Sequence, residues 1–113
     1  MQYSNFIIFI SELIGTFGLL VAATGSIVYD ARIGGTLGIV FISAMHFVGL
    51  AIVVSAFGKF SMAHFNPAVT IGFLIAGYAK PKQLPIYFSA QGIGAILGTM
   101  FVKYFFGEYA NLG

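Results

Sequence analysis

The sequence predicts an all-α membrane protein made of three transmembrane helices and one re-entrant half-helix. Of its 113 residues, 59% are hydrophobic and only 7% are charged, whereas a soluble domain carries about 25% charged residues. Three apolar stretches are long enough for a spanning helix, which needs roughly 20 residues. A fourth, shorter apolar stretch begins at an Asn-Pro pair. We expect residues 1–113 to form one unit.

The composition excludes several classes of protein. Without cysteine, the chain has no disulfide or thiol chemistry. Its five basic side chains are too few for a nucleic-acid footprint, so we expect no nucleic-acid partner. The first apolar run is too long for a signal-peptide core and lacks a basic region before it, which favours a permanent span. We expect no enzyme activity, catalytic residue, cofactor or metal site.

The first two predicted spans are residues 6–28 and residues 35–57. Glu12 is the one ionisable side chain of the first span, and His46 interrupts the second. Residues 29–35, YDARIGG, form a short polar turn between them.

The third predicted span covers residues 84–106. It opens with Pro85 in its first turn, where the missing N–H costs little. Residues 77–83, GYAKPKQ, form a loop by their Gly, Pro and Lys content. Pairs of glycines spaced four residues apart predict close helix contacts. These pairs are Gly34/Gly38 and Gly94/Gly98.

Residues 58–77 predict a pore loop followed by a half-helix. The segment PAVTIGFLIAG is too short to span, since its 11 residues make about 16 Å of helix. Asn66 is a favoured N-cap, Pro67 fits the first helical position, and Gly77 fits just past the end. The proline therefore begins a helix. Irregular backbone inside a membrane is tolerated only where it is buried in protein or lines a water-filled cavity. Three spans do not enclose such a cavity alone, so we expect an oligomer.

Three segments resemble the aquaporin and glycerol-facilitator family. SMAHFNPAVTIG (residues 61–72) is similar to its first pore loop, whose signature is Asn-Pro-Ala. SELIGTF (residues 11–17) resembles the Glu-x-x-x-Thr pattern of its first helix, and SAQGIGAILG (residues 89–98) resembles its third helix. The segments occur in the family order and cover essentially the whole chain. The resemblance implies a passive channel in a lipid bilayer.

The resemblance covers only the first half of that family. Full members resemble two inverted repeats, whose half-helices meet at mid-membrane. This sequence has one Asn-Pro-Ala, and Val69 stands at the position equivalent to the arginine of the family's second motif. The facing half is expected from an inverted second copy, with an assembly of four such pairs as one arrangement, from a complementary chain, or from a longer protein of which this is a fragment.

The charges are nearly balanced between the two membrane faces. With the N-terminus inside, the inner face holds Lys59, Lys80 and Lys82, and the outer face holds Arg32 and Lys103. Such a weak bias permits insertion in both orientations. We expect a multi-pass protein of the cell membrane.

The candidate constriction lies at Asn66–Val69. Asn66 can cap the half-helix and still offer amide N–H groups to a solute, or it can act as a plain cap. The helix N-terminus adds about half a positive charge, which repels cations and orients water. Pro67 and Ala68 are structural parts of the motif, and Val69 is an apolar pore wall.

The loop before the motif is expected to supply a ladder of free carbonyls for water. The carbonyls of Ser61, Met62, Ala63 and His64 have no helix partners in this prediction, as the family resemblance implies. His64 is also expected to brace the loop through a hydrogen bond.

Glu12 allows two interpretations. An intramembrane carboxylate can couple protons in a transporter, or it can accept hydrogen bonds from the pore loop and hold its shape. The resemblance favours the second role. Thr16 lies one turn further on the same face, and we expect it, with Gln91, to belong to the same loop support.

A residue of the second span is expected to line the selectivity filter, as the resemblance implies. One alignment gives Val48 this place and the other gives His46, and the sequence does not decide between them. Water is the expected solute, with small neutral solutes such as glycerol or ammonia. The rivals are a small multidrug-resistance-like transporter that uses Glu12 and a non-conducting assembly subunit.

Overall fold

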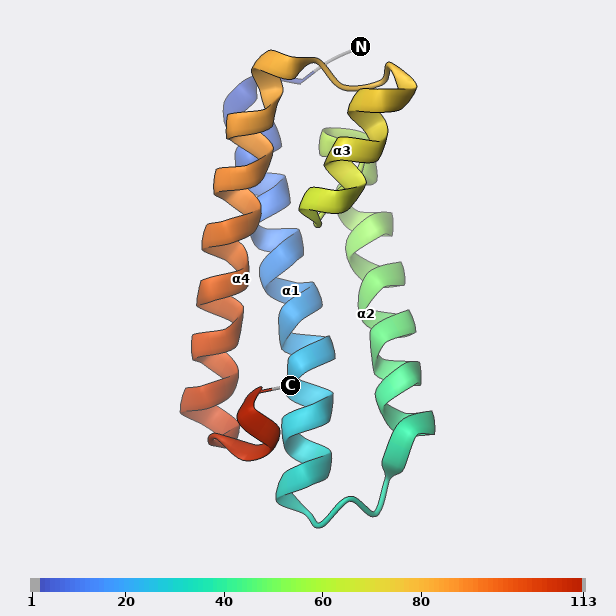
Figure 1. Cartoon of the computed structure of the whole chain (residues 1–113), viewed down its shortest axis with the longest axis vertical. Coiled ribbons are helices and arrows are strands. Elements are labelled where there is room, and N and C mark those ends of the chain that lie inside the picture. The colour runs from blue at the N-terminus through green and yellow to red at the C-terminus, as the bar shows by residue number, and fades with distance from the viewer. Residues whose placement is uncertain (1–2, 113) are drawn as a thin grey trace.

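The computed structural model describes residues 3–112, which fold as an elongated bundle of helices measuring 46 × 24 × 22 Å (Figure 1). In chain order the elements are α1 (Asn5–Arg32), α2 (Gly38–Ser61), α3 (Pro67–Ala76), η1 (Pro81–Gln83), α4 (Leu84–Phe106) and η2 (Tyr109–Leu112). The helical segments that contain α1, α2 and α4 are each long and apolar enough to cross a membrane. The chain is therefore an all-α membrane protein.

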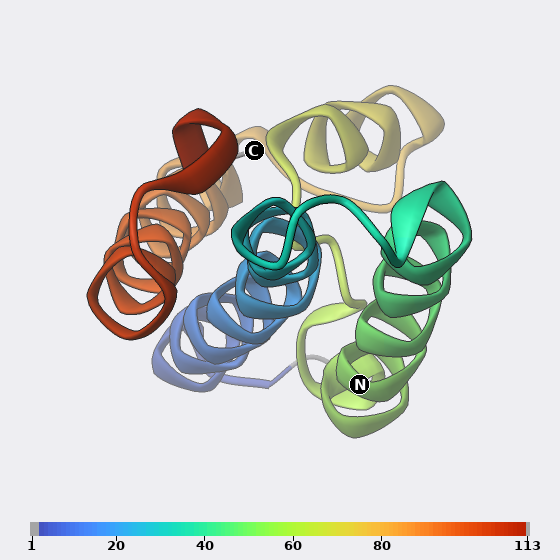
Figure 2. The same cartoon turned by 90° about the horizontal axis from the view of Figure 1, so that it is seen from below.

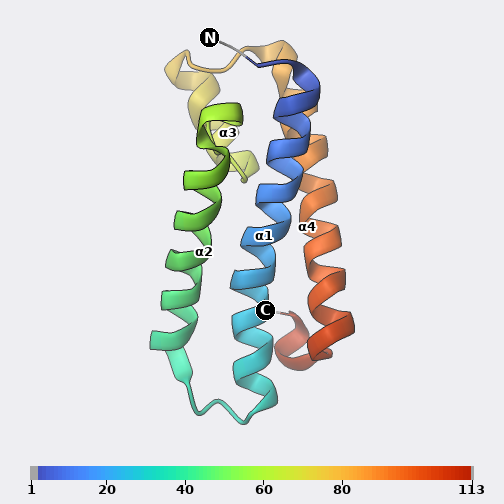
Figure 3. The ribbon, with the colours of Figure 1, turned by 180° about the vertical axis from the view of Figure 1, so that it is seen from behind.

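The central helix is α1, with α4 packed on one side and α2 on the other (Figures 2 and 3). Small residues allow both close approaches. A Cβ added at Gly94 would come within 2.5 Å of the carbonyl oxygen of Leu13, and one added at Gly49 would lie 2.6 Å from Ala22 Cβ. Gly98 also lies against α1, where an added Cβ would be 3.0 Å from the carbonyl oxygen of Phe17, so the helix contact predicted for Gly94/Gly98 is confirmed.

The prediction for Gly34/Gly38 is wrong. Neither glycine has a neighbour within 4 Å of the position of an added Cβ, and both have positive φ values, +94° and +72°. They shape the turn between α1 and α2. Asp30 closes that turn, because its Oδ1 accepts the backbone N–H groups of Leu37 (2.9 Å) and Gly38 (3.0 Å).

Two helices extend beyond their predicted bounds. The first continues into the predicted polar turn as far as Arg32, and α2 continues to Ser61, although the sequence predicts a loop from residue 58. Here the helical hydrogen bonds simply persist, and Met62 N–H still donates to Gly58 O at 2.9 Å. Met62, with φ of 68°, ends the helix. The irregular pore loop is consequently reduced to residues 62–66.

The half-helix α3 begins and ends as predicted. Asn66 Oδ1 accepts the N–H of Ala68 at 2.8 Å, Pro67 is the first helical residue, and Gly77 ends the helix with φ of 88°. Its 10 residues correspond to about 15 Å. The bounds of α4 match those of the third predicted span.

Most of the apolar surface of α2 is left uncovered by the rest of the chain. Of its 24 residues, only Gly49, Val53 and Ser61 are buried. Exposed apolar side chains on this scale are stable against lipid or another protein, not against water.

Candidate functional site

The carboxylate of Glu12 joins three parts of the chain. Glu12 is fully buried, and its Oε2 accepts the hydroxyl of Ser61 (2.6 Å) and the backbone N–H of His64 (3.1 Å). Its Oε1 accepts the backbone N–H of Phe65 (2.8 Å) and Nε2–H of Gln91 (2.9 Å). An ionised carboxyl group has about four acceptor positions, and all are used here. Glu12 on α1 thus holds the end of α2, the pore loop and α4 together.

His64 lies in the same buried cluster. Its Nδ1 is 2.9 Å from the hydroxyl oxygen of Thr70, the bracing hydrogen bond that the sequence predicts. The imidazole ring is stacked between Phe73 and Tyr87, with ring centroids 4.4 and 4.0 Å away. Because its side chain is only 3% exposed, it faces the interior of the chain and not an open channel.

The carbonyl of Ser61 accepts a side-chain hydrogen bond that the sequence did not predict. The phenol of Tyr87 donates to that carbonyl oxygen at 2.7 Å, and Ser61 is buried as the last residue of α2. One of the two acceptor positions of this carbonyl is therefore already used within the chain. In the remaining loop, Met62 and Ala63 have positive φ values of 68° and 54°, and the Met62 side chain is exposed.

Two members of the cluster, Thr70 and Tyr87, were not predicted from the sequence. Thr70 is 0% exposed and accepts a hydrogen bond from Gln91 Nε2 at 2.9 Å. Thr70 is the one residue with a hydroxyl group inside an otherwise apolar half-helix. Its polarity could have indicated a hydrogen-bonding role from the sequence. Tyr87 precedes Gln91 by four residues and so shares its helix face.

Thr16 is buried beside this cluster but does not join its hydrogen bonds. Among the described residues its hydroxyl oxygen has no partner, and the same holds for Oε1 of Gln91. Thr16 instead packs where α1 and α4 approach closely at Gly94. Of the two residues expected in the loop support, Gln91 joins its hydrogen bonds and Thr16 does not.

The N-terminus of α3 lies at mid-length of the spanning helices. A cavity of about 270 Å³ has Asn66 and Pro67 in its wall together with Leu20 and Ala95, which are near the midpoints of α1 and α4. Asn66, Pro67, Ala68 and Val69 are all exposed in the single chain, and Val69 lines a separate groove with Gly72 and Phe73. The positive end of the half-helix, about half an elementary charge, thus stands at the depth expected for a constriction.

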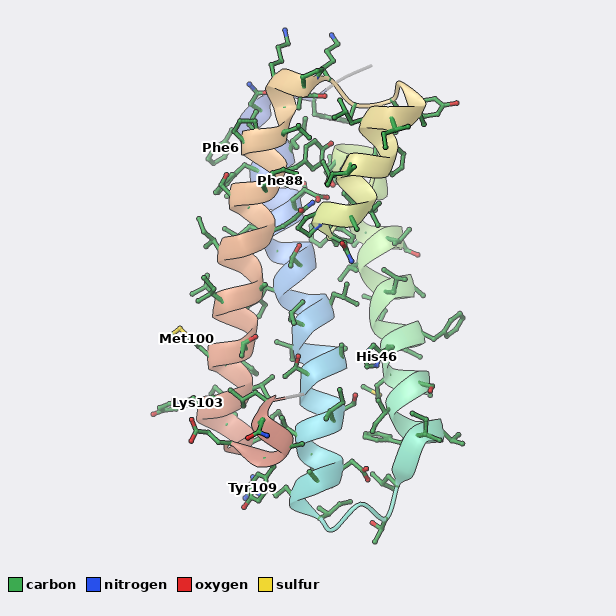
Figure 4. The ribbon with its side chains drawn as sticks, viewed as in Figure 1. Phe6, His46, Phe88, Met100, Lys103 and Tyr109 are labelled. Carbon is green, nitrogen blue, oxygen red and sulfur yellow. The ribbon has the colours of Figure 1, made fainter. Side chains whose placement is uncertain are left out.

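His46 and Val48 occupy different faces of α2. His46 is seven residues before the buried Val53 and eleven before Phe57, which contacts the pore-loop residue Phe65 with ring centroids 6.5 Å apart. These spacings place the three residues on one helix face. In Figure 4 the His46 side chain lies on the side of α2 nearer α1. Val48 lines an open groove formed by α2 residues alone, on the outer face.

Comparisons with known proteins agree with the three resembling segments. The profile of the major intrinsic protein family matches residues 2–113. The chain is 35% identical over 98 residues to Aquaporin NIP1-1 of Zea mays, covering 87% of this chain and 35% of the relative. It is 32% identical over 105 residues to Probable aquaporin NIP7-1 of Arabidopsis thaliana, covering 93% and 38%.

A third relative is Probable aquaporin NIP-type of Nicotiana alata, 39% identical over 90 residues, which are 80% of this chain and 33% of the relative. The chain therefore spans about a third of the length of these curated relatives. Since the family profile covers nearly all of the sequence, the chain belongs to the major intrinsic protein family.

Proposed function

We propose that this chain forms one half of a passive membrane channel for water and small neutral solutes, such as glycerol or ammonia. The observation that carries the proposal is the half-helix α3, whose Asn66-capped N-terminus lies at mid-length of the spanning helices. A positive helix end at that depth disfavours cations and orients water by its oxygen. The relatives named as aquaporins support the same class of function.

The second half of the channel is an inverted copy of the same chain. The described residues have one half-helix, and its length of about 15 Å covers half of a hydrocarbon core of about 30 Å. A copy with the opposite orientation adds a second half-helix in the other half of the membrane. The near balance of basic residues between the two faces is compatible with dual insertion into the cell membrane.

Glu12 supports the pore loop in this proposal. Both of its oxygens accept hydrogen bonds from the loop and its neighbours, as expected for a carboxylate that holds the loop in shape. This arrangement favours a channel over a proton-coupled transporter.

The pore wall on α2 includes His46, because it shares a helix face with Val53 and Phe57. Val69 directly follows the Asn-Pro-Ala motif. In the facing half of full family members, the resemblance places an arginine at the equivalent position. With valine at both positions of a homodimer, the filter is less polar than that of a strict water channel. Small neutral solutes then pass as well as water.

Swelling of proteoliposomes measured by stopped-flow light scattering tests the proposal. Vesicles that contain the chain are expected to shrink faster than empty vesicles in a gradient of an impermeant solute. In a glycerol gradient they are expected to re-swell faster after the initial shrinkage, because glycerol enters and water follows. Equal rates in empty and protein-containing vesicles would overturn the homodimeric channel. Flux that appears only after a complementary chain is added would identify that chain as the other half.

A further inference from the structure

An apolar groove runs between α1 and α2 toward the turn that joins them, at the end of the molecule opposite to α3 (Figure 1). Its volume is about 500 Å³. It extends from Gly18, at mid-length of α1, to Tyr29 and Phe41 near that turn. Among the described residues, none from α3, the pore loop or the buried cluster around Glu12 lines it. The groove is therefore separate from the proposed constriction.

The length and the lining of the groove match one hydrocarbon chain of a lipid. Gly18 and Tyr29 are 11 positions apart in the sequence, which is about 16 Å along a helix. One leaflet contributes about half of a hydrocarbon core of about 30 Å. Ser26 is a polar residue in the wall, but its hydroxyl already donates to the carbonyl oxygen of Ala23 at 2.8 Å. The groove thus offers apolar surface over the depth of one leaflet.

Aromatic rings close the end of the groove at the membrane surface. The ring of Tyr29 contacts those of Phe41 and Phe106, with centroids 6.3 and 6.2 Å away. Tyrosine is favoured at the depth of lipid headgroups, where its ring contacts hydrocarbon and its hydroxyl contacts water. Tyr29 is 41% exposed, so its position marks the headgroup level at this end of the groove.

Arg32 continues the face of α1 that lines the groove. It follows Gly25 by seven residues and Val21 by eleven, and these spacings place all three on one helix face. Its side chain is exposed. The salt bridge found among the described residues joins Lys103 to Glu108, so Arg32 has no carboxylate partner there. An exposed guanidinium group consequently stands at the headgroup end of an apolar groove.

The neighbouring acid does not neutralise this arginine. Asp30 is two residues before Arg32 and so projects from a different face of α1. Its Oδ1 already accepts the backbone N–H groups of Leu37 and Gly38. The positive charge of Arg32 is therefore available to a ligand.

We propose that this groove binds one anionic phospholipid, with an acyl chain between α1 and α2 and the phosphate group at Arg32. A guanidinium group donates two parallel N–H bonds to a phosphate, and a headgroup with a net negative charge adds attraction. The inference goes beyond the proposed channel and does not depend on how its halves pair.

Charge favours a lipid over an inverted second copy as the occupant. An inverted copy would bring its other end, which carries Lys59, Lys80 and Lys82, to the membrane face that holds Arg32. Like charges repel, whereas an anionic headgroup attracts the arginine.

Fluorescence quenching tests the groove, because the sequence has no tryptophan. Phe41→Trp places a reporter in the groove, and Met45→Trp is a second reporter that lines it. Val40→Trp is the matched control, since residue 40 lies at almost the same depth, is 78% exposed and does not line the groove. Each variant is reconstituted in phosphatidylcholine vesicles that contain increasing fractions of phosphatidylglycerol with brominated acyl chains. Half-maximal quenching is expected at a lower fraction for the groove reporters than for Val40→Trp.

A charge variant tests the contact with the headgroup. In the Phe41→Trp chain, Arg32→Gln removes charge-assisted hydrogen bonds and is expected to raise the half-quenching fraction about tenfold. Arg32→Lys keeps the charge and is expected to restore part of the affinity. Lys82→Gln, at the opposite end of the chain, is the control and is expected to leave the value unchanged. Helical circular dichroism checks that each variant is folded.

Every other outcome overturns the proposal. Equal quenching of the groove reporters and Val40→Trp would show that only bulk lipid contacts the groove. Equally strong quenching by brominated phosphatidylcholine would show that an acyl chain binds without selection by Arg32. Weaker quenching of the groove reporters by both lipids would show that a second copy of the chain covers the groove. Since none of these measurements uses water flux, failure of the proposed channel is a separate result.

Discussion

The carboxylate of Glu12 accepts the backbone N–H of Phe65 at 2.8 Å, although 53 residues separate them in the sequence. This bond joins α1 to the loop residue that comes directly before Asn66. Because the loop backbone at Met62, Ala63 and Phe65 has positive φ values, it cannot satisfy its own hydrogen bonds as a helix would. The position of the Asn66-capped helix end therefore depends on a side chain from the first helix.

Replacing Glu12 by Gln is expected to destabilise the chain. An amide keeps one acceptor oxygen but directs N–H groups at the other donors. Each donor left without an acceptor costs about 1–3 kcal/mol. Thermal unfolding in detergent measures the loss. The control is Glu108→Gln, because the Glu108–Lys103 pair is exposed (2.9 Å; 63% and 55% exposed side chains) and is expected to matter little. Unchanged stability of Glu12→Gln, together with loss of proton-coupled uptake, would instead support a transporter.

Substitution of Gly15 by Ala is expected to displace the pore loop. A Cβ at this position would overlap the ring of Phe65, which is 3% exposed and cannot move outwards freely. Overpacking of this kind costs about 1–3 kcal/mol. Gly72→Ala is the matched control, since its Cβ would meet nothing within 4 Å and a helical Ala gains up to about 1 kcal/mol. Equal unfolding temperatures for the two variants would contradict the packing of Phe65 on Gly15.

Asn66→Asp and Asn66→Ala separate capping from electrostatics. Aspartate caps as well as asparagine, whereas alanine costs about 1 kcal/mol of helix stability. Aspartate also places a negative charge at the helix end and removes the N–H groups. We expect Asn66→Asp to keep its stability and to raise the leak of protons or cations, measured with a pH-sensitive dye inside proteoliposomes. A leak equal to that of the wild type would argue against a pore at Asn66.

His46→Ala is expected to change solute selectivity, and Val48→Ala is not. The first position shares the face of α2 that contacts the pore loop, whereas the second lines an outer groove. Both side chains are exposed in the single chain, so stability should change by no more than about 0.5 kcal/mol. The ratio of glycerol to water permeability in proteoliposomes is the measurement, and it should rise for His46→Ala. A rise for Val48→Ala alone would reverse the assignment.

The sequence by itself determined the fold class and the polarity of the half-helix. Apolar length and low charge lead to three spans because lipid demands continuous hydrophobic helices. The Asn66–Pro67 pair and Gly77 determine where α3 starts and ends because capping and backbone freedom are local properties. The Asn-Pro-Ala signature of the family could also be recognised from the sequence, because its residues are contiguous.

Tertiary structure alone decided which neighbours each residue has. It showed that Gly34 and Gly38 shape a turn while Gly94 and Gly98 pack against α1, although both pairs have the same spacing. It assigned the carbonyl of Ser61 to Tyr87, left the hydroxyl of Thr16 without a partner among the described residues, and separated His46 from Val48. The physical reason is that hydrogen bonds and close packing between distant segments depend on how helices cross, and spacing along one helix does not specify its partner.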